Sequence, residues 1–219
     1  MNLGSYFIQI LSNITLKKNE YLYKRVRQSL KYKRNEILYN KANEELAEFK
    51  ILAGKEKIKL IYLDESGFSG DLPVNYSWTK KGQQKHIPKI NNSNTKINVL
   101  GLFDYKKQQM AYSTTQDKMD SEMFISLFDI TKPESKVPVY IVLDNYSIHT
   151  SKKTKKKRIE WEKENIFFYH IPPSCPELNL IEGKWRNLKH NRIRKRYFDN
   201  SNDLESTVKR EIDIMNNKA

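Results

Sequence analysis

The chain has 219 residues and a mass of 26.1 kDa, with 38% hydrophobic and 30% charged residues, which suffices for one ordinary domain with extra length or for two small ones. Its single cysteine excludes an intrachain disulfide framework and a cysteine-rich zinc module. No apolar run approaches the ~18 residues that a membrane-spanning helix needs, and the amino end lacks the pattern of a signal peptide. We therefore expect a cytoplasmic protein.

The charge balance points to a polyanionic partner. Lys and Arg number 40 against 26 Asp and Glu, which gives a formal net charge of +14 at pH 7. Nucleic acid is the first candidate, because phosphate contacts supply most of the non-specific affinity of basic proteins for it. A lysine- and asparagine-rich proteome would give the same composition, so composition alone does not separate the two interpretations.

The first half of the chain changes from a helical to a strand pattern. A basic, tyrosine-rich stretch over 17–35 precedes a predicted helix over 35–50, where apolar residues recur near 3.6-residue spacing and Gly54 provides an end. An apolar strand then leads from Ile58 into Asp64. After this strand, the sequence predicts a loop over 66–94 and two strands, over 96–104 and 108–115.

Helices and strands alternate in the second half. Three strands joined by short connections favour an antiparallel part, and two strands reached through helices favour a parallel part. We therefore expect an α/β fold with a mixed five-stranded sheet and helices on both faces, in the order found in ribonuclease-H-like folds. The predicted helices cover 120–130, 151–164, 180–196 and 203–216, and the strands cover 139–143 and 166–170.

Three acidic residues stand where strand ends or a helix start would place them. Asp64 ends the first predicted strand, Asp144 ends the fourth, and Glu182 lies in the first turn of a late helix. The ends of adjacent strands line one crevice, and carboxylates there could hold Mg²⁺ ions. Each acid also has a structural interpretation, because the aspartates are common turn formers and Glu182 fits a capping box with Asn179 as N-cap.

Four motifs surround these acids in order. They read Asp64-Glu-Ser-Gly-Phe68, Trp78 with Lys81-Gly82, Val142-Leu-Asp-Asn-Tyr-Ser-Ile-His149, and Pro173-Ser-Cys-Pro-Glu-Leu-Asn-Leu-Ile-Glu-Gly-Lys-Trp185. From about Lys57 to Lys189 the chain resembles the catalytic domain of DDE transposases of the mariner superfamily, in its bacterial insertion-sequence branch. The resemblance implies a ribonuclease-H-like fold and DNA cleavage and strand transfer that depend on two Mg²⁺ or Mn²⁺ ions. Asp64, Asp144 and Glu182 would be the metal ligands and catalytic residues.

Two residues depart from the family's usual Ser-Pro-Glu-Leu-Asn-Pro-Ile-Glu motif. Cys175 replaces the serine and Leu180 replaces the second proline. Proline at a helix start fixes the backbone in advance, so the leucine leaves the direction of Glu182 less constrained. The partners that the resemblance implies are double-stranded DNA, at element ends and target, together with a second copy of the chain or a full-length transposase, in a nucleoid-associated location.

The resemblance also predicts how the chain is divided. We expect a remnant of a DNA-binding region with a helical linker over 1–54, a DDE catalytic domain over 55–198, and a carboxy-terminal helix packed on it over 199–219. Family members begin with helix-turn-helix modules, whereas here the segment near residues 21–30 resembles only the linker that follows them, so we expect a shortened transposase or one half of a split reading frame. The alternatives are a catalytically inert DNA-binding or dimerising remnant and a cellular ribonuclease-H-like nuclease. The proline-rich loop that leads into Glu182 argues against the nuclease.

Further residues are expected to support the ligands or to bind DNA. Glu65 would point to the face of its strand opposite Asp64 and so support the site indirectly. Asn145 could hydrogen-bond a carboxylate or phosphate, and His149 could touch DNA or cap the following helix, although capping or local packing would explain both equally well. Asn179 is expected to lie with them behind the ligands. A set of basic residues would contact the DNA backbone without reading its sequence, unless they only form solvated helix faces. These are Lys152, Lys153, Lys155, Lys156, Lys157, Arg158, Lys184, Arg186 and Lys189.

Overall fold

The computed structural model describes residues 31–70, 95–193, 198 and 200–217. The chain divides into two compact units, Met1–Tyr32 and Lys33–Ala219, and the second contains the whole sheet. The predicted linker near residues 21–30 and the motif residues Trp78 and Lys81-Gly82 lie outside the described residues.

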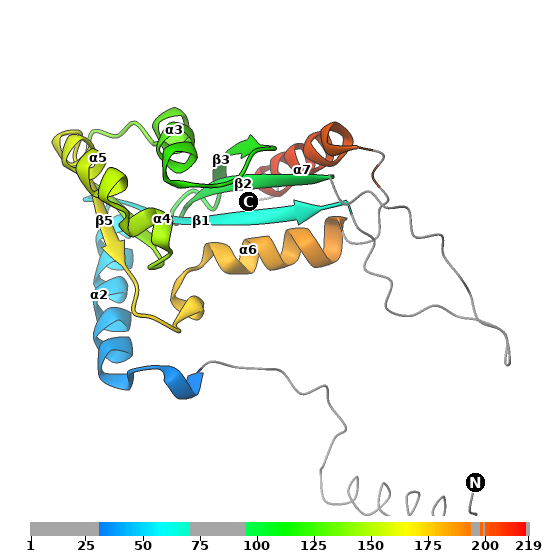
Figure 1. The fold of residues 1–219 in the computed structure, drawn as a ribbon. Helices are drawn as coiled ribbons and strands as arrows, with labels where there is room; N and C mark the ends of the chain where they lie inside the picture. Colours follow the sequence, from blue (N-terminus) through cyan, green and yellow to red (C-terminus); the bar gives the residue numbers. More distant parts are fainter. Residues whose placement is uncertain (1–30, 71–94, 194–197, 199, 218–219) are drawn as a thin grey trace, which may run out of the picture. The chain divides into compact units, whose positions relative to one another are not determined.

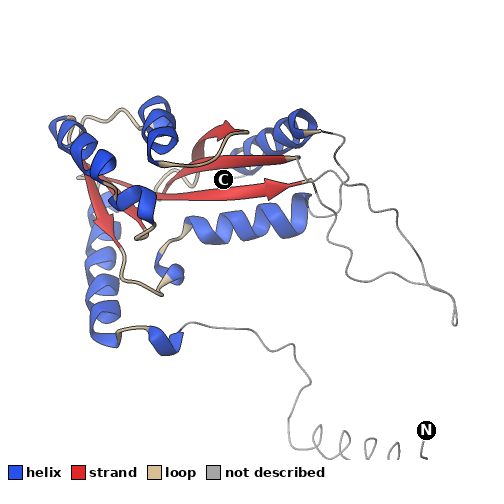
Figure 2. Cartoon of the chain, viewed as in Figure 1, coloured by secondary structure: helices blue, strands red, loops and turns tan. Residues whose placement is uncertain are grey.

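A five-stranded mixed sheet organises the second unit, with the strand order β3-β2-β1-β4-β5 (Figures 1 and 2). β1 pairs antiparallel with β2, and β2 pairs antiparallel with β3. β1 and β4, and then β4 and β5, pair in parallel. This is the predicted ribonuclease-H-like sheet. The strands are β1 (Lys59–Ser69), β2 (Lys96–Asp104), β3 (Met110–Thr115), β4 (Val139–Leu143) and β5 (Ile166–His170).

Helices cover both faces of the sheet, and each face has its own hydrophobic core. α2, α6 and α7 pack on one face, against the side chains of Leu60 and Tyr62. α3, α4 and α5 pack on the other, against Ile61 and Leu63. The helical elements are η1 (Lys31–Lys33), α2 (Glu36–Gly54), α3 (Ser121–Thr131), α4 (Ser147–Thr150), α5 (Lys152–Lys163), η2 (Pro176–Leu178), α6 (Ile181–Asn187), the π-helix η3 (Leu188–Ile193) and α7 (Ser201–Asn216).

Side-chain caps set where the longer helices begin. Asp120 accepts hydrogen bonds from the first backbone N–H groups of α3, and Ser151 does the same for α5. Asn35 caps α2, which runs through Gly54 rather than ending at Lys50. Near its start Ile37 is 80% exposed, so the predicted apolar face of this helix is buried only further along. None of the helices among the described residues is long and apolar enough to cross a membrane.

The prediction that β1 ends at Asp64 was wrong. The strand continues to Ser69, because β2 remains paired with it as far as the Ser69–Lys96 pair. On its other edge β1 pairs with β4 only up to Tyr62. Asp64 therefore lies inside one strand but just beyond the end of the neighbouring parallel strand, which is where a crevice opens at the edge of such a sheet.

Candidate active site

Asp64 and Glu182 meet because α6 packs on the face of the sheet toward which Asp64 points. Successive strand residues alternate between faces, so Asp64 shares a face with Leu60 and Tyr62. Its cross-strand partner is Gly101. A Cβ at Gly101 would lie 2.5 Å from the Trp185 ring, so only glycine lets α6 approach this closely. Trp185 is buried there as part of the core.

Asn179 joins the two elements that carry these acids. Its side-chain amide donates a hydrogen bond of 2.9 Å to the backbone carbonyl of Leu63, next to Asp64. Its own carbonyl accepts a hydrogen bond of 3.1 Å from the backbone N–H of Glu182. The prediction that the Asn179 side chain caps the helix was therefore wrong, because α6 has Leu180 at its N-cap and no side-chain cap. Asn179 links β1 to α6 instead.

Asp144 follows β4 and is fixed by its own loop. Its Oδ1 accepts hydrogen bonds from the Tyr146 backbone N–H at 2.9 Å and from Nδ1 of His149 at 3.1 Å. Its backbone carbonyl lies 3.0 Å from Nδ1 of His170. The neighbouring Asn145 donates a hydrogen bond to the carbonyl of Ile171, which ties this loop to the end of β5.

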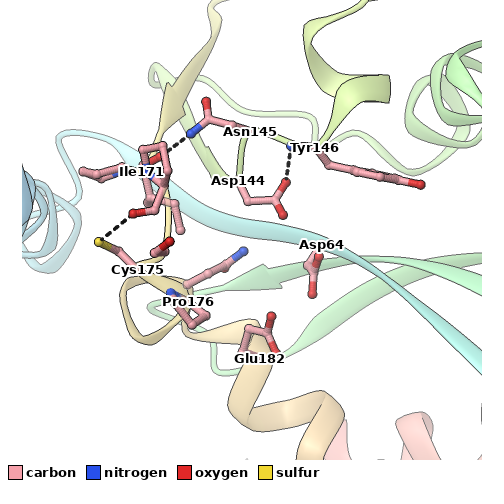
Figure 3. A pocket seen from close by; sticks show the side chains of 12 residues that line it. Asp64, Asp144, Asn145, Tyr146, Ile171, Cys175, Pro176 and Glu182 are labelled. Atoms are coloured by element: carbon pink, nitrogen blue, oxygen red, sulfur yellow. Dashed lines mark hydrogen bonds between the residues drawn. The ribbon is translucent and has the colours of Figure 1, made fainter. Parts of the chain in front are cut away.

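The three acids border one cavity of about 310 Å³. Figure 3 shows the carboxylates of Asp64, Asp144 and Glu182 facing a common space from β1, from the loop after β4 and from the start of α6. The rest of the wall comes from Asn145 and Tyr146 of the loop after β4 and from the segment before α6. That segment includes Cys175, which is buried and donates a hydrogen bond to the carbonyl of Pro173. Among the described residues, no three His, Cys, Asp or Glu side chains are gathered closely enough to hold a metal ion as they stand.

The electrostatics of the two aspartates differ. Burial, together with the charges of Glu182, Glu65 and Asp144, raises the pKa of Asp64 to about 8. Burial also acts to raise the pKa of Asp144, but the hydrogen bonds from His149 and Tyr146 outweigh it and hold that pKa below its usual value. At neutral pH Asp144 is therefore ionised, whereas Asp64 retains a proton as long as no cation offsets the surrounding charge.

Glu65 points to the opposite face of β1, as predicted, and meets His149 there. His149 is fully buried, and its Nε2 lies 2.8 Å from Oε1 of Glu65. Burial acts to lower the pKa of His149, but its hydrogen bonds to Asp144 and Glu65 raise it to about 9. Because both ring nitrogens face carboxylate oxygens, which only accept hydrogen bonds when ionised, the imidazole is held as a cation between two anions.

A second cavity adjoins the first and shares Asp64 and Glu182 with it. Its wall includes Arg186 and Lys189, two of the predicted DNA-binding residues. The ammonium group of Lys189 lies 5.2 Å from the centre of the Phe68 ring. Lys184, on α6, lies over the Phe103 ring instead, at 4.4 Å. Of these residues, Arg186 and Lys189 border the acidic centre directly.

The six predicted DNA-binding residues of α5 divide into two groups. Lys152, Lys155 and Lys156 are exposed. The other three contact groups on the protein itself. Lys153 pairs with Glu122, Lys157 pairs with Asp129 and Glu160, and Arg158 donates a hydrogen bond to the His149 carbonyl and lies over the Phe168 ring.

Comparison with known proteins assigns the family. The model of the DDE superfamily endonuclease family matches residues 59–205, which contain all three acids. The chain belongs to this family. A search of curated proteins found no match.

Solved structures of Mos1 complexes share the fold. The Mos1 strand transfer complex matches with a TM-score of 0.67 at 16% identity, over 96% of this chain and 67% of the other. The Mos1 mariner paired end complex with Mn matches with a TM-score of 0.65 at 15% identity, over 95% of this chain and 68% of the other. The Mos1 transposase paired-end complex with left transposon end matches with a TM-score of 0.63 at 17% identity, over 94% of this chain and 62% of the other.

Proposed function

We propose that this endonuclease domain is the catalytic domain of a transposase, which cuts DNA strands at the ends of a mobile element and joins them to target DNA. The observation that carries the proposal is the set of three carboxylates, brought from β1, the loop after β4 and α6 to one cavity. Two of the similar structures are paired-end complexes of Mos1 and one is a strand transfer complex, and this supports the same class of reaction here.

The donor set suits Mg²⁺ or Mn²⁺. Hard cations take carboxylate oxygens, and a bound cation would offset the burial and the neighbouring negative charges that together raise the pKa of Asp64. Mg²⁺ keeps several waters and binds through few carboxylates and the substrate phosphates, so it needs no closed cage of protein ligands. Asp64, Asp144 and Glu182 would hold two ions, which in such sites activate the attacking oxygen and stabilise the leaving one.

The chain's own residues position the reacting groups. Asn179 fixes Glu182 relative to the strand of Asp64, and the Tyr146 N–H orients Asp144. In the first reaction, a water oxygen loses a proton and bonds to phosphorus as the bond from phosphorus to the 3′ oxygen breaks, and that 3′ oxygen takes up a proton. In the second, the freed 3′-hydroxyl loses its proton as its oxygen bonds to a target phosphorus, and the target's 3′ oxygen leaves that phosphorus and takes up a proton. No side chain becomes covalently attached to DNA.

Double-stranded DNA is the partner that this site requires. The exposed lysines of α5 and the basic wall of the second cavity would neutralise backbone phosphates on either side of the scissile bond. We further propose that two copies of the chain act together, because a transposition reaction must pair two element ends. The paired-end complexes of Mos1 support this arrangement.

Metal-dependent nicking of supercoiled DNA tests the proposal. We expect purified wild-type protein to nick a plasmid in Mn²⁺ and not in EDTA. Asp144→Asn removes one ligand charge and should lower the rate about a thousandfold, since metal stabilisation of the transition state is worth several kcal/mol. Asp117→Asn is the matched control, because Asp117 is exposed and borders neither cavity.

Each other outcome has a defined meaning. If folded wild-type protein binds DNA with an affinity that falls as salt rises, yet never nicks it, the chain is an inert DNA-binding remnant and the proposed activity is wrong. If Asp144→Asn nicks as fast as wild type, the activity comes from a contaminant or from another site.

A further inference from the structure

The two motifs that carry Asp64 and Asp144 are joined by one buried side chain. His149 is 0% exposed, and its ring nitrogens contact Asp144 on one side and Glu65 on the other, at 3.1 Å and 2.8 Å. Glu65 is mostly buried, with 11% of its side chain exposed, whereas Asp144 is 49% exposed at the cavity. The ring therefore connects the interior of the domain to the cavity.

His149 is held in place independently of Asp144. Its ring packs against Phe124 of α3, with 4.9 Å between ring centres. Its carbonyl accepts a hydrogen bond of 3.0 Å from Arg158, and the preceding carbonyl, of Ile148, accepts one of 2.6 Å from the hydroxyl of Thr154. Both donors belong to α5. A ring fixed by its packing and its backbone dictates where its hydrogen-bond partner lies.

The hydrogen bonds of the Asp144 side chain are all made by one oxygen. Oδ1 accepts both the Tyr146 N–H and Nδ1 of His149. Within the described part of the chain, no hydrogen bond reaches Oδ2. The two donors thus fix the plane of the carboxylate and leave one oxygen for a ligand in the cavity. Partners that orient a metal-binding group in this way typically change metal affinity by about 10- to 100-fold when they are removed.

Glu65 fits a role behind His149 better than a direct role in the reaction. It points away from the face of β1 that carries Asp64, and its Oε1 is occupied by the histidine. It also borders the second cavity, which is the one position from which it could reach a ligand itself. The experiment below separates these two roles.

We propose that His149 is a positioning residue that orients the Asp144 carboxylate for metal binding, and that Glu65 acts only by holding His149. This inference rests on the proposed metal-dependent function. It gives one purpose to two residues that stand 84 positions apart in the sequence.

Histidine variants test each contact separately. The Asn amide overlaps the position of Nδ1 and the Gln amide that of Nε2, so His149→Asn retains a donor for Asp144 and His149→Gln retains one for Glu65. We expect His149→Ala and His149→Gln to weaken Mn²⁺ binding about 10- to 100-fold, measured by electron paramagnetic resonance of free Mn²⁺ without DNA. His149→Asn should recover most of the affinity. DNA binding in EDTA should not change.

A double-mutant cycle tests the role of Glu65. We expect Glu65→Gln to bind Mn²⁺ nearly as wild type does, because its amide oxygen still accepts from His149. Glu65→Ala should weaken binding in the wild-type background and have no further effect in the His149→Ala background. Glu162→Gln, on the exposed side of α5, is the control. Circular dichroism and melting temperatures of the Asn and Gln variants confirm that they fold.

The outcomes are distinguishable. Wild-type Mn²⁺ affinity in folded His149→Ala overturns the positioning role. An undiminished effect of Glu65→Ala in the His149→Ala background overturns the indirect role of Glu65 and indicates a direct ligand. If the wild-type protein neither binds Mn²⁺ nor nicks DNA, the proposed function is wrong and the positioning role falls with it.

Discussion

Asp64 and Glu65 are neighbours on β1 and lie in opposite electrostatic environments. Asp64 faces α6, where Glu182 and Asp144 add negative charge and no cation of the protein forms an ion pair with it among the described residues. Glu65 faces α4, where the buried His149 lies 2.8 Å away. Asp64 therefore holds its proton up to a pKa of about 8, whereas Glu65, the next residue along the chain, is paired with the His149 ring.

The difference shows how a sheet can build a cation site within a stable domain. Strand alternation sends consecutive side chains to opposite faces of the sheet, so Glu65 can pair with His149 while Asp64 faces the other acids. Packing offsets the repulsion on the acidic face, and the close approach of Trp185 to Gly101 is part of that packing. The predictions that follow alter the two faces one at a time.

The largest effect should come from Gly101→Ala, which breaks the acidic face alone. The new Cβ would lie 2.5 Å from Trp185, whose indole ring cannot bend away, so α6 must shift. We expect a loss of about 3 kcal/mol in the free energy of unfolding, measured by urea denaturation, together with the loss of nicking. Gly67→Ala is the control, since its Cβ meets only the Asn98 side chain, at 3.4 Å. Equal stability of the two variants would contradict the close packing of α6.

Asp64→Asn should stabilise the metal-free protein. The folded chain holds a proton on Asp64 up to a pKa of about 8, whereas the unfolded chain releases it near 3.8, so the stability of the wild type falls as pH rises between these values. The Asn side chain does not titrate, so the stability of the variant does not fall for this reason as pH rises. We expect it to be about 2 kcal/mol more stable at pH 8 and equal to wild type near pH 4, measured by thermal melting over that range. Added Mn²⁺ should stabilise only the wild type.

Asn179→Ala should loosen the link between β1 and α6. The substitution leaves the buried carbonyl of Leu63 without its donor and should cost about 1.5 kcal/mol in the free energy of unfolding. Nicking should fall further than stability accounts for, because Glu182 loses its position relative to Asp64. Asn191→Ala, at an exposed position on η3, provides the comparison. Unchanged nicking in folded Asn179→Ala would mean that α6 packing alone positions Glu182.

The smallest effect should come from Glu205, whose carboxylate accepts hydrogen bonds from its neighbours and does not line the cavity of the three acids. Hydrogen bonds from Lys209 and then Thr114 lower its pKa to about 2. Its contribution is therefore present above the unfolded value of 4.5 and is lost as pH falls toward 2. We expect Glu205→Gln to cost about 1 kcal/mol at pH 7, shown by thermal melting, and the cost to vanish near pH 2. An effect that did not change with pH would point to lost packing instead.

Most of the sheet could be predicted from the sequence. The strands over 96–104, 139–143 and 166–170 appear with the expected bounds, because each is a short apolar run between polar or proline-containing segments. The end of β1 could not be predicted, because Ser66 and Gly67 read as a turn and become strand only through pairing with β2. The four-residue α4 and the π-helical turns after α6 have no sequence signal of their own.

The acids of the site could be predicted from their motifs, but their surroundings could not. The glycine at position 101, inside an apolar strand, is a signal of close approach that could have been interpreted as a packing position. The contact between Glu65 and His149 has no such signal, because strand alternation predicts only the face toward which Glu65 points. Its partner depends on how α4 is placed by α5. The domain boundaries and the DNA-contacting residues stay predictions.

The single cysteine of the chain can report how often its surroundings open, through the rate at which its thiol is labelled. Cys175 is 1% exposed and lies in the segment that leads into α6. Burial also raises the pKa of its thiol, so a thiol reagent must wait until the segment opens locally. The labelling rate of the wild-type protein therefore measures how often the segment that precedes Glu182 in the chain opens locally. Its slowing upon addition of metal or DNA would report, without any engineered probe, how firmly a bound ligand closes the site.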